Sequence, residues 1–516
     1  MDTILILDFG SQTTQLIGRR IRDLGVRSTI IAGDRRLDDA TLSDVKGIIL
    51  SGSPASVADD DAPRPDPRIY HCGVPILGIC YGLQRLVAEL GGRVEVSVAR
   101  EYGRSRQRYR TAHPLFHGVP DGFVSWMSHG DSIRQLPDGA TLVTESEHGL
   151  PGCVAFAQHS MVGIQFHPEV THCEYGDAIL ENFAIRICGA RRQWTVEHYL
   201  QQQGAQIRKQ VGSAPVLLLI SGGVDSTVTA ALLLQTLDPQ QVHLMYVDTG
   251  LMRDGESEEV ARGLRALGAR HLYLIDAEQR FLSRLAGVDD PEQKRERIGD
   301  TFIEVQQEEV KRHIDGDYFL AQGTLYTDLI ESGRGVGAKA KVIKSHHNVR
   351  SPLVEARRAA GRIVEPLAGL YKDEVRRLGT LLGVAPEIVD RHPFPGPGLA
   401  VRILGEVTKD KCDILRAVDD IYISQLRARG LYADIWQAFS VLLPVRSTGV
   451  TGDARGYGYV AALRAVVSRD GMTADVFAFP PQDLLEISAL ITNRVPQVGR
   501  VVYDVSSKPP ATIEWE

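Results

Sequence analysis

The chain has 516 residues, of which 43% are hydrophobic and 24% are charged, and its formal net charge is −7. This length predicts roughly three domains, with cores large enough to need no disulfide. The acidic balance disfavours broad binding of nucleic acid. Six cysteines without CxxC spacing disfavour a disulfide scaffold or a zinc ribbon and predict a reducing, cytoplasmic location. The apolar run 3–7 is too short to span a bilayer, so we expect no membrane association.

Short apolar runs alternate with amphipathic helical stretches, which predicts βαβ units around parallel sheets. The strands predicted in a first block are 3–7, 47–50, 74–79 and 161–166. After a polar helical connection over 191–211, the strands predicted in a second block are 216–220, 242–247, 271–275 and 317–321. We therefore expect a domain boundary near residue 195.

A second change in the pattern comes at 391–398, where closely spaced prolines disfavour a helix. Beyond it, helices predicted at 409–429 and 481–493 alternate with strands predicted at 457–463 and 500–505. The expected fold class is α/β, with two parallel-sheet domains and a C-terminal α+β domain. The predicted domains are 1–194, 195–395 and 396–516.

A cysteine lies in a sharp turn between a predicted strand and a helical stretch. Strand 74–79 runs into a G-x-C-x-G turn at 78–82, whose glycines allow the thiol of Cys80 to be raised to a helix N-terminus that favours the thiolate. A later strand delivers His167, and Glu169 follows two residues on. A thiol nucleophile needs a base, and the base needs an acceptor that fixes its tautomer, so these three residues predict a catalytic triad.

These motifs resemble those of the class I glutamine amidotransferases over residues 1–190. The resemblance implies a flavodoxin-like domain in which glutamine is hydrolysed through a thioester on Cys80, releasing ammonia. It further implies an oxyanion hole from the backbone amides of Ser53 and Tyr81, and glutamine contacts from Gln84, His129 and Asp131. The family usually has glycine where Ser53 stands. Serine can also donate its backbone N–H, but a positive φ there would cost about 1 kcal/mol or more.

A second glycine-rich turn follows the all-apolar strand 216–220. Its residues are Ser221, Gly222, Gly223, Val224, Asp225, Ser226 and Thr227, and a helix follows. Backbone N–H groups that converge at a helix N-terminus form a site for phosphate. Because the lysine of a P-loop is absent, we exclude a P-loop NTPase. The motif S-G-G-x-D-S instead resembles the pyrophosphate loop of the N-type ATP pyrophosphatases.

That resemblance implies an adenine nucleotide α-hydrolase-like domain in which these seven residues bind ATP. Asp225 is implied to help hold Mg²⁺, which prefers oxygen ligands. Val247 and Asp248 end the next strand and Gly323 follows a later one, at the edge where open α/β sheets place ligands. Lys372 opens a helix from which it can reach the phosphates, and these four residues complete the predicted ATP site.

Residue types distinguish among the pyrophosphatases. Residues 195–395 contain no cysteine for a persulfide, which argues against a tRNA-thiolating enzyme, and residue 2 is Asp2 rather than the cysteine of an asparagine synthetase. The glutaminase motifs differ from the nitrilase-like domain of NAD synthetases. A triad glutaminase joined to an N-type pyrophosphatase resembles the glutamine-hydrolysing GMP synthases, and the stretches 391–400, 445–453 and 503–516 extend the resemblance over the whole chain.

This resemblance implies that xanthosine monophosphate (XMP), ATP and glutamine are the substrates. ATP adenylates XMP at O2, and ammonia then displaces AMP to give GMP. The C-terminal domain is implied to form a homodimer and to supply XMP contacts. The implied contacts are Arg295, Gln437, Asp453, Lys508, Ile513 and Glu514. A glycine-containing lid is implied at 334–347.

Two other hypotheses stay open at this point. One is a nucleotide-sensing scaffold that retains a degenerate glutaminase, and the other is the same class of enzyme acting on a different nucleotide. The sequence also departs from the family after 346–348, where glycines are common in bacterial members and Val349-Arg350-Ser351-Pro352 stand here.

Overall fold

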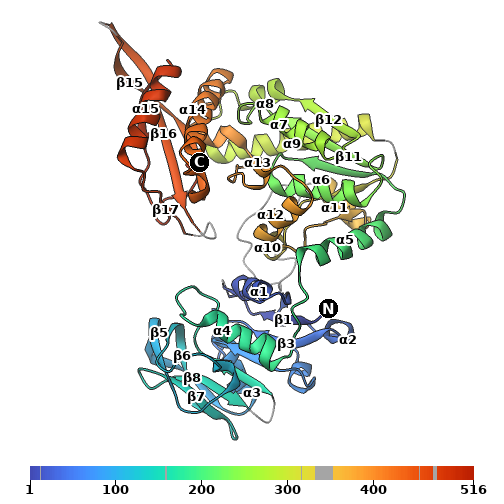
Figure 1. Ribbon diagram of the computed structural model, residues 1–516, viewed down its shortest axis with the longest axis vertical. Coiled ribbons are helices and arrows are strands. Elements are labelled where there is room, and N and C mark those ends of the chain that lie inside the picture. Colours follow the sequence, from blue (N-terminus) through green and yellow to red (C-terminus); the bar gives the residue numbers. More distant parts are fainter. Residues whose placement is uncertain (12, 157–159, 315, 332–351, 452–453, 469–472) are drawn as a thin grey trace. The chain divides into compact units, whose positions relative to one another are not determined.

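The computed structural model describes the chain except for residues 12, 157–159, 315, 332–351, 452–453 and 469–472 (Figure 1). The chain divides into two compact units. One comprises Met1–Tyr199 and Tyr326–Ser345, and the other comprises Leu200–Leu325 and His346–Glu516. The predicted lid and residues 349–351 lie outside the described residues. The division into three domains stays a prediction, since the second and third predicted domains fall largely in one unit.

The first unit contains a mixed sheet in the order β2-β1-β3-β4-β9-β8-β7-β5-β6. Its parallel half consists of β1 (Thr3–Asp8), β2 (Arg27–Ala32), β3 (Val45–Leu50), β4 (Ile76–Ile79) and β9 (Met161–Ile164). These strands are largely apolar because both faces of the parallel half are covered. The predicted strands of this block are confirmed to within two residues.

The other half of this sheet is antiparallel and was not predicted. It consists of β5 (Arg93–Tyr109), β6 (Val124–Gln135), β7 (Thr141–Ser146) and β8 (Pro151–Phe156). Polar residues alternate with apolar ones there, as in β6, where Met127 is buried and His129 follows on the same face. The predicted α/β class with a parallel sheet is confirmed for this unit. The antiparallel strands were missed because strands with one solvated face lack a continuous apolar run.

Helices cover the parallel half of the first sheet. They are α1 (Thr14–Asp23), α2 (Asp39–Leu42), α3 (Tyr81–Glu89) and α4 (Gly176–Glu181), with a π-helical turn over Asn182–Ile187 and 3₁₀ turns at Pro67–His71 and Pro114–Phe116. The helix after the cysteine turn begins directly at Tyr81, so Cys80 stands at its N-terminus. Helix α10 (Tyr326–Glu331) packs with this unit, where the Tyr326 hydroxyl contacts the backbone of Ile30.

The second unit begins with a parallel sheet in the order β12-β11-β10-β13-β14. Its strands are β10 (Val216–Ile220), β11 (Val242–Asp248), β12 (His271–Asp276), β13 (Phe319–Ala321) and β14 (Ile363–Val364). The chain runs outward from β10 to β12 and then returns to β13. The strand order therefore reverses between β10 and β13, and a crevice for ligands forms at the carboxyl edge of such a point.

Helices connect and cover these strands. They are α5 (Val196–Val211), α6 (Val224–Thr236), α7 (Glu256–Ala266), α8 (Glu278–Leu285), α9 (Pro291–His313), α11 (Pro352–Ala359), α12 (Lys372–Leu381) and α13 (Pro386–Val389). The connecting helix α5 starts later than the predicted residue 191. Residues Arg391–Pro397 form no helix, as their prolines predicted, and a 3₁₀ turn over Gly398–Arg402 follows.

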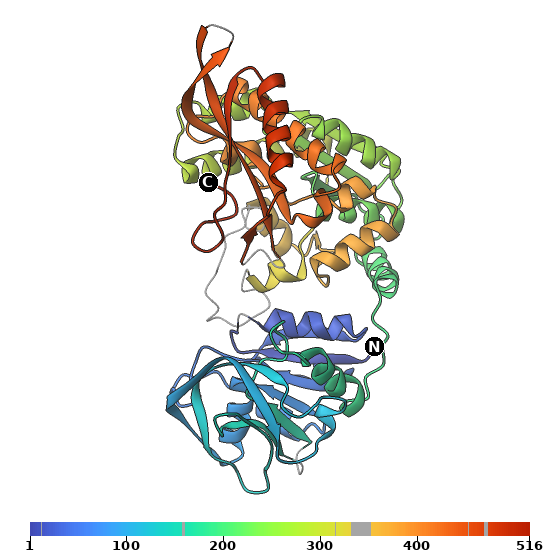
Figure 2. The same cartoon turned by 60° about the vertical axis from the view of Figure 1, so that its left-hand side comes forward.

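The C-terminal part of this unit is a four-stranded sheet with two helices. Its strands are β15 (Gln437–Thr451), β16 (Ala454–Val467), β17 (Asp475–Val476) and β18 (Val498–Tyr503). Helix α14 (Lys409–Ala428) packs on β15, and α15 (Pro481–Arg494) packs on β18 (Figure 2). The predicted α+β pattern is confirmed, although the strand predicted at 457–463 is the middle of a longer strand, because β15 and β16 form an extended hairpin.

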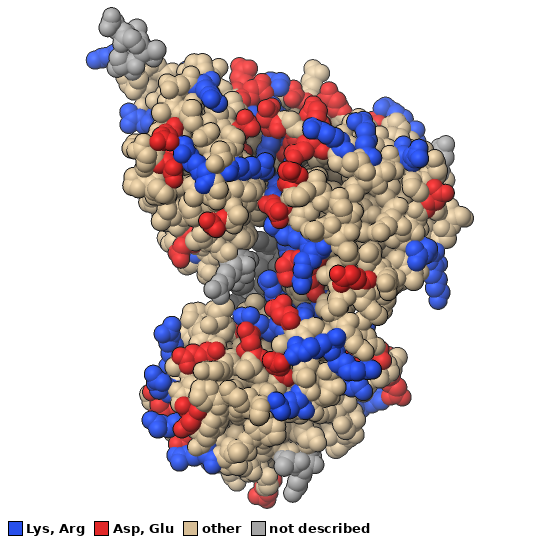
Figure 3. All heavy atoms as spheres, viewed as in Figure 1, with Lys and Arg blue, Asp and Glu red and all other residues tan. Residues whose placement is uncertain are grey.

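One hydrophobic core is shared by the elements before and after the proline-rich stretch. It joins Val247 and Phe281 of the first part to Leu415, Ala461 and Ile487 of the C-terminal part, all buried. Acidic and basic side chains are interspersed over the face drawn in Figure 3. Within the described part of the chain, every helix is too short or too polar to cross a membrane.

The shared core predicts that the two parts of the second unit unfold together. Phe281 is fully buried in that core, so Phe281→Ala should lower the free energy of unfolding by about 3–5 kcal/mol. In a Trp126→Phe/Trp194→Phe background, the remaining tryptophans are Trp436 and Trp515, and their fluorescence reports the C-terminal part. In Phe281→Ala, we expect the denaturation midpoint followed by this fluorescence to fall together with the midpoint followed by the circular dichroism of the helices. Leu485→Ala, at an exposed position, is the control. An unchanged tryptophan midpoint would show separate cores.

Candidate functional site

The turn that carries Cys80 depends on two glycines. Cys80 has φ 54°, in the left-handed region that few side chains adopt. A Cβ on Gly78 would lie 2.5 Å from the backbone of Gly82, and a Cβ on Gly82 would lie 2.3 Å from the carbonyl oxygen of Leu50. The strand can therefore turn directly into α3 only where these side chains are missing. This geometry supports the predicted nucleophile turn.

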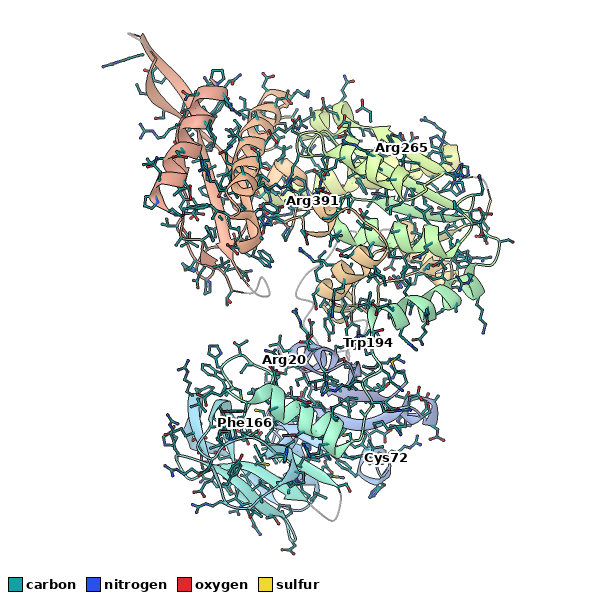
Figure 4. The ribbon with its side chains drawn as sticks, viewed as in Figure 1. Arg20, Cys72, Phe166, Trp194, Arg265 and Arg391 are labelled. Atoms are coloured by element: carbon teal, nitrogen blue, oxygen red, sulfur yellow. The ribbon has the colours of Figure 1, made fainter. Side chains whose placement is uncertain are left out.

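The predicted triad residues meet at the ends of β4 and β9. His167 follows Phe166, which is labelled in Figure 4, and its Nδ1 lies 2.8 Å from Oε1 of Glu169. Burial alone would lower the pKa of His167, but the Glu169 carboxylate and the interaction with Cys80 outweigh it and raise the pKa well above its usual value. A protonated His167 stabilises a thiolate at Cys80, so the arrangement suits a thiol nucleophile.

The loop predicted to hold an oxyanion lies beside the triad. A Cβ on Gly52 would be 3.4 Å from Cε1 of His167, which brings residues 51–53 to the imidazole. Ser53 is not among the residues with positive φ, so serine replaces the family's glycine without backbone strain. Tyr81 is the first residue of α3, whose leading N–H groups lack partners within the helix. Both predicted backbone donors thus lie on segments that flank the thiol.

The predicted glutamine contacts lie together in one buried network. Nε2 of Gln84 donates to the carbonyl oxygen of Asp131 at 3.2 Å, and Nδ1 of His129 lies 2.8 Å from the same oxygen. The other side of the His129 ring faces Glu101, with 3.4 Å between Nε2 and Oε2. The contacts of Gln84 and His129 therefore fix the backbone of 129–131, while Asp131 itself is partly exposed.

Two residues of this network were missed by sequence reasoning. Gln165 is buried beside Cys80, where its Nε2 donates to Sγ at 3.6 Å and its Oε1 accepts from Gln84. Glu101 accepts from Ser146 at 2.8 Å, and despite its burial its contacts with His129 and Ser146 hold its pKa below the usual value. A glutamine inside the apolar run before His167 was the available signal for Gln165, whereas Glu101 had none.

The predicted pyrophosphate loop joins β10 to α6. Gly222 has φ 80°, and Gly223 is the residue that caps α6. The hydroxyls stabilise the turn, since Ser226 donates to the carbonyl oxygen of Gly223 at 3.0 Å and lies 3.1 Å from the hydroxyl of Ser221. Thr227 also donates to Gly223 at 3.0 Å. The loop is therefore preformed at a helix N-terminus, as phosphate binding requires.

Asp225 and Lys372 form an ion pair at this loop. Nζ of Lys372 lies 2.7 Å and 2.6 Å from the two carboxylate oxygens of Asp225. Both side chains are partly exposed. Lys372 is the first residue of α12, so the ion pair joins the N-terminus of α12 to the first turn of α6. A Cβ on Gly323 would lie 3.3 Å from the backbone of Asp225, which places the segment after β13 at the same point.

Arg391 was missed by the sequence analysis, although it opens the motif 391–400. Figure 4 labels it where the parallel-sheet part of the second unit meets the C-terminal part. Its Nη1 donates to Oε1 of Glu256 at 2.6 Å and to the carbonyl oxygen of Gly222 at 3.4 Å. Its Nη2 donates to Oε2 of Glu259 at 2.6 Å. This buried guanidinium therefore links the pyrophosphate loop to α7.

Asp248 is the last residue of β11 and lies at the carboxyl edge of the parallel sheet. Its carboxylate accepts from the backbone of Gly250 at 2.9 Å and from the hydroxyl of Ser257 at 2.6 Å, while Val247 beside it is buried. Two pockets border this carboxylate. One, of about 470 Å³, is also lined by residues of β12, and the other, of about 420 Å³, is also lined by Lys409. The predicted Val247 and Asp248 contacts thus lie at the carboxyl edge of the sheet.

The predicted XMP contacts fall on separate elements of the second unit. Nε2 of Gln437 donates to Oε1 of Glu514 at 2.7 Å, so these two are in direct contact. Ile513 is buried next to Glu514. Arg295 lies in the first turns of α9 and pairs with Glu292, and Lys508 pairs through its backbone with Ala474. Asp453 lies outside the described residues.

Comparisons with known proteins agree with these motifs. Residues 5–187 match the family model described as glutamine amidotransferase class-I, and residues 424–515 match the model of the GMP synthase C terminal domain. A glutamine-hydrolysing GMP synthase from Aquifex aeolicus is 50% identical over 513 residues, which are 99% of each chain. One from Thermus thermophilus is 51% identical over 515 residues, covering 99% of this chain and 100% of the relative.

A third relative of the same name, from Geobacillus kaustophilus, is 48% identical over 516 residues and covers 100% of this chain and 99% of its own. The similarity therefore runs through the glutaminase motifs, the pyrophosphate loop and the C-terminal part without a break. Because about half of its residues are identical to those of these relatives along essentially the whole length, the chain belongs to the family of glutamine-hydrolysing GMP synthases.

Proposed function

We propose that this protein makes GMP from XMP, ATP and glutamine. The observation that carries the proposal is the presence in one chain of a preformed Cys80–His167–Glu169 triad and a preformed S-G-G-x-D-S loop. The first suits the release of ammonia from glutamine, and the second suits the activation of a carbonyl oxygen by ATP. An intact triad favours an enzyme over a scaffold with a degenerate glutaminase.

In the proposed glutaminase step, the thiolate of Cys80 attacks the side-chain amide of glutamine. The backbone N–H groups of Ser53 and Tyr81 stabilise the oxyanion, and His167 gives its proton to the departing ammonia. Water then hydrolyses the thioester to glutamate, with His167 as the base. Gln84, His129 and Asp131 support substrate binding through the backbone network of 129–131.

In the proposed synthetase step, the O2 atom of XMP attacks the α-phosphate of ATP, and pyrophosphate leaves towards the loop Ser221–Thr227. Ammonia then adds at C2 of the adenylated XMP, and AMP departs. Lys372 is placed to exchange its ion pair with Asp225 for the phosphates. Val247, Asp248 and Gly323 contribute to the ATP site, and Gln437, Glu514, Ile513, Lys508 and Arg295 to the XMP site.

We propose that Mg²⁺ enters with ATP and is held in part by Asp225. The chemistry of the donor fits, because this carboxylate already attracts a cation in the form of Lys372. In the described part of the chain, no cluster of three or more His, Cys, Asp or Glu could hold a metal alone, so phosphate and water oxygens would complete the shell. The ion would offset the charge of the leaving pyrophosphate.

We further propose a cytoplasmic homodimer formed by the C-terminal part, as the family resemblance implies. The exposed side chains of Val445, Tyr457 and Val505 lie on that part and support an interface there. The mixture of acidic and basic side chains in Figure 3 gives no support for a nucleic-acid partner.

The role of Cys80 is tested by removing its thiol. Cys80→Ala should abolish GMP synthesis with glutamine but retain synthesis with ammonium, because the ATP and XMP sites lie on other elements. GMP formation is measured with each nitrogen donor. Cys72→Ala, which removes a thiol labelled in Figure 4 outside the site, should keep both activities. Loss of both activities in Cys80→Ala would contradict the assignment.

The charge of Glu169 is tested through the reactivity of Cys80. Glu169→Gln removes the carboxylate that helps to raise the pKa of His167, so that pKa should fall below its wild-type value and the imidazolium would be lost at lower pH. The alkylation of Cys80 by iodoacetamide at pH 7 should slow by about tenfold or more. The rate is followed against pH by the mass of the Cys80 peptide. Glu147→Gln, at an exposed position, is the control, and an unchanged rate in Glu169→Gln would contradict the prediction.

The synthetase step is tested by AMP release with a panel of nucleoside monophosphates, ATP and ammonium. Release should occur with XMP and not with IMP, GMP or UMP, whereas release with another nucleotide instead would support a different substrate.

Asp225→Asn should lower the rate of AMP release with XMP by about 100-fold or more, because the variant loses a negative charge at the phosphate loop. Asp238→Asn, in the exposed turn after α6, should leave the rate unchanged.

A further inference from the structure

The segment 504–516 carries three of the proposed XMP contacts but has almost no regular structure. It follows β18, and its backbone hydrogen-bonds to Leu463 of β16 at Asp504 and to Ala474 through an isolated bridge at Lys508. Backbone ladders therefore do not determine where Glu514 lies. Its position must come from the side chains that surround the segment.

Two buried arginines hold this segment to the C-terminal part. Arg464 of β16 donates to the carbonyl oxygens of Thr512 and Ile513 at 2.9 and 2.8 Å, and pairs with Asp504 at 2.8 Å. Arg402 binds the two carboxylate oxygens of Glu514 at 3.1 and 2.8 Å. Both guanidinium side chains are fully buried.

A third buried cation comes from a different element. Lys294 lies in α9 and is 0% exposed, and its Nζ donates to Oε2 of Glu516 at 2.5 Å. It also donates to the carbonyl oxygens of Ile403 and Ala400 at 2.7 and 3.3 Å. An ammonium has three donors, so these contacts satisfy it completely. Lys294 thus ties the segment to the start of α9, where Arg295 is the next residue.

We propose that Lys294 is a positioning residue for the nucleotide substrate, acting through its ion pair with Glu516. The pair sets the segment, and with it Glu514, at a fixed place relative to Arg295 on α9. This inference rests on the proposed function, since it needs XMP to bind between these contacts. Arg402 and Arg464 join the segment to the 3₁₀ turn Gly398–Arg402 and to β16, whereas the pair of Lys294 with Glu516 joins it directly to α9.

The energetics explain why the pair holds its geometry. A buried charge that loses its partner is strongly unfavourable, so Glu516 is held where it meets the ammonium. Binding groups that shift by about 1 Å can lose about 100-fold in efficiency. A loosened segment should therefore weaken the binding of XMP while leaving ATP and glutamine, which contact other residues, unaffected.

The test uses Glu516→Gln, which keeps the shape of the side chain and removes its charge. With ammonium as donor, we expect KM for XMP to rise by about tenfold or more, with KM for ATP and the hydrolysis of glutamine within twofold of the wild type. Glu486→Gln is the matched control. Glu486 also forms an ion pair in the C-terminal part, with Arg429 at 2.9 Å, but its side chain is 46% exposed. A KM for XMP within twofold of the wild type in Glu516→Gln would overturn the proposal.

The double variant Lys294→Met/Glu516→Gln separates positioning from stability. It leaves no buried ammonium without a carboxylate, which should outweigh the two lost contacts with the carbonyl oxygens of Ile403 and Ala400. Its thermal midpoint should therefore exceed that of Glu516→Gln, yet its KM for XMP should stay high because the tie is still missing. Recovery of KM together with the midpoint would show a merely structural role and overturn the proposal. If Glu516→Gln does not fold, the double variant carries the same KM test. A wild-type protein that does not turn over XMP would instead contradict the proposed function.

Discussion

Both candidate centres stand where a strand leads into a helix, directly at Cys80 and through the short turn 221–223 in the second unit. At the cysteine turn, backbone segments come so close that a Cβ does not fit on Gly82, where it would lie 2.3 Å from the carbonyl oxygen of Leu50. The result is a helix N-terminus, with unpaired N–H groups and a positive dipole end, at the edge of a sheet. This environment favours a thiolate at Cys80 and the binding of phosphate at the loop 221–227.

Buried charges then determine how each centre is held. In the first unit, Glu169 and Cys80 together outweigh the burial of His167, raise its pKa and favour its protonated form. In the second unit, Arg391 connects the pyrophosphate loop to α7, and Lys294, Arg402 and Arg464 hold the segment 504–516. These cations are tolerated because each has carboxylates or carbonyl oxygens as partners. Their partners are far away in the sequence, so they join segments that local structure leaves separate.

The elements that could be predicted were those with a strong local pattern. Parallel strands such as β1 and β10 were found because a strand buried on both faces is a continuous apolar run. The antiparallel strands β5–β8 were missed, since one face is solvated and the pattern resembles that of loops. Within the sites, Cys80, His167 and Asp225 stood in short motifs, whereas Glu101 and Lys294 stood in none and became significant only through their partners.

The sequence by itself determined the kinds of chemistry, because a G-x-C-x-G turn, a His-Pro-Glu and an S-G-G-x-D-S loop need only neighbouring residues and glycines to form. Tertiary structure decided which distant groups complete them. The contact of Gln437 with Glu514, the tie between Lys294 and Glu516 and the pair of Lys372 with Asp225 each join residues that only packing brings together. Such pairs leave no local signal, because the free energy that selects them comes from burying opposite charges side by side rather than from the conformation of either segment.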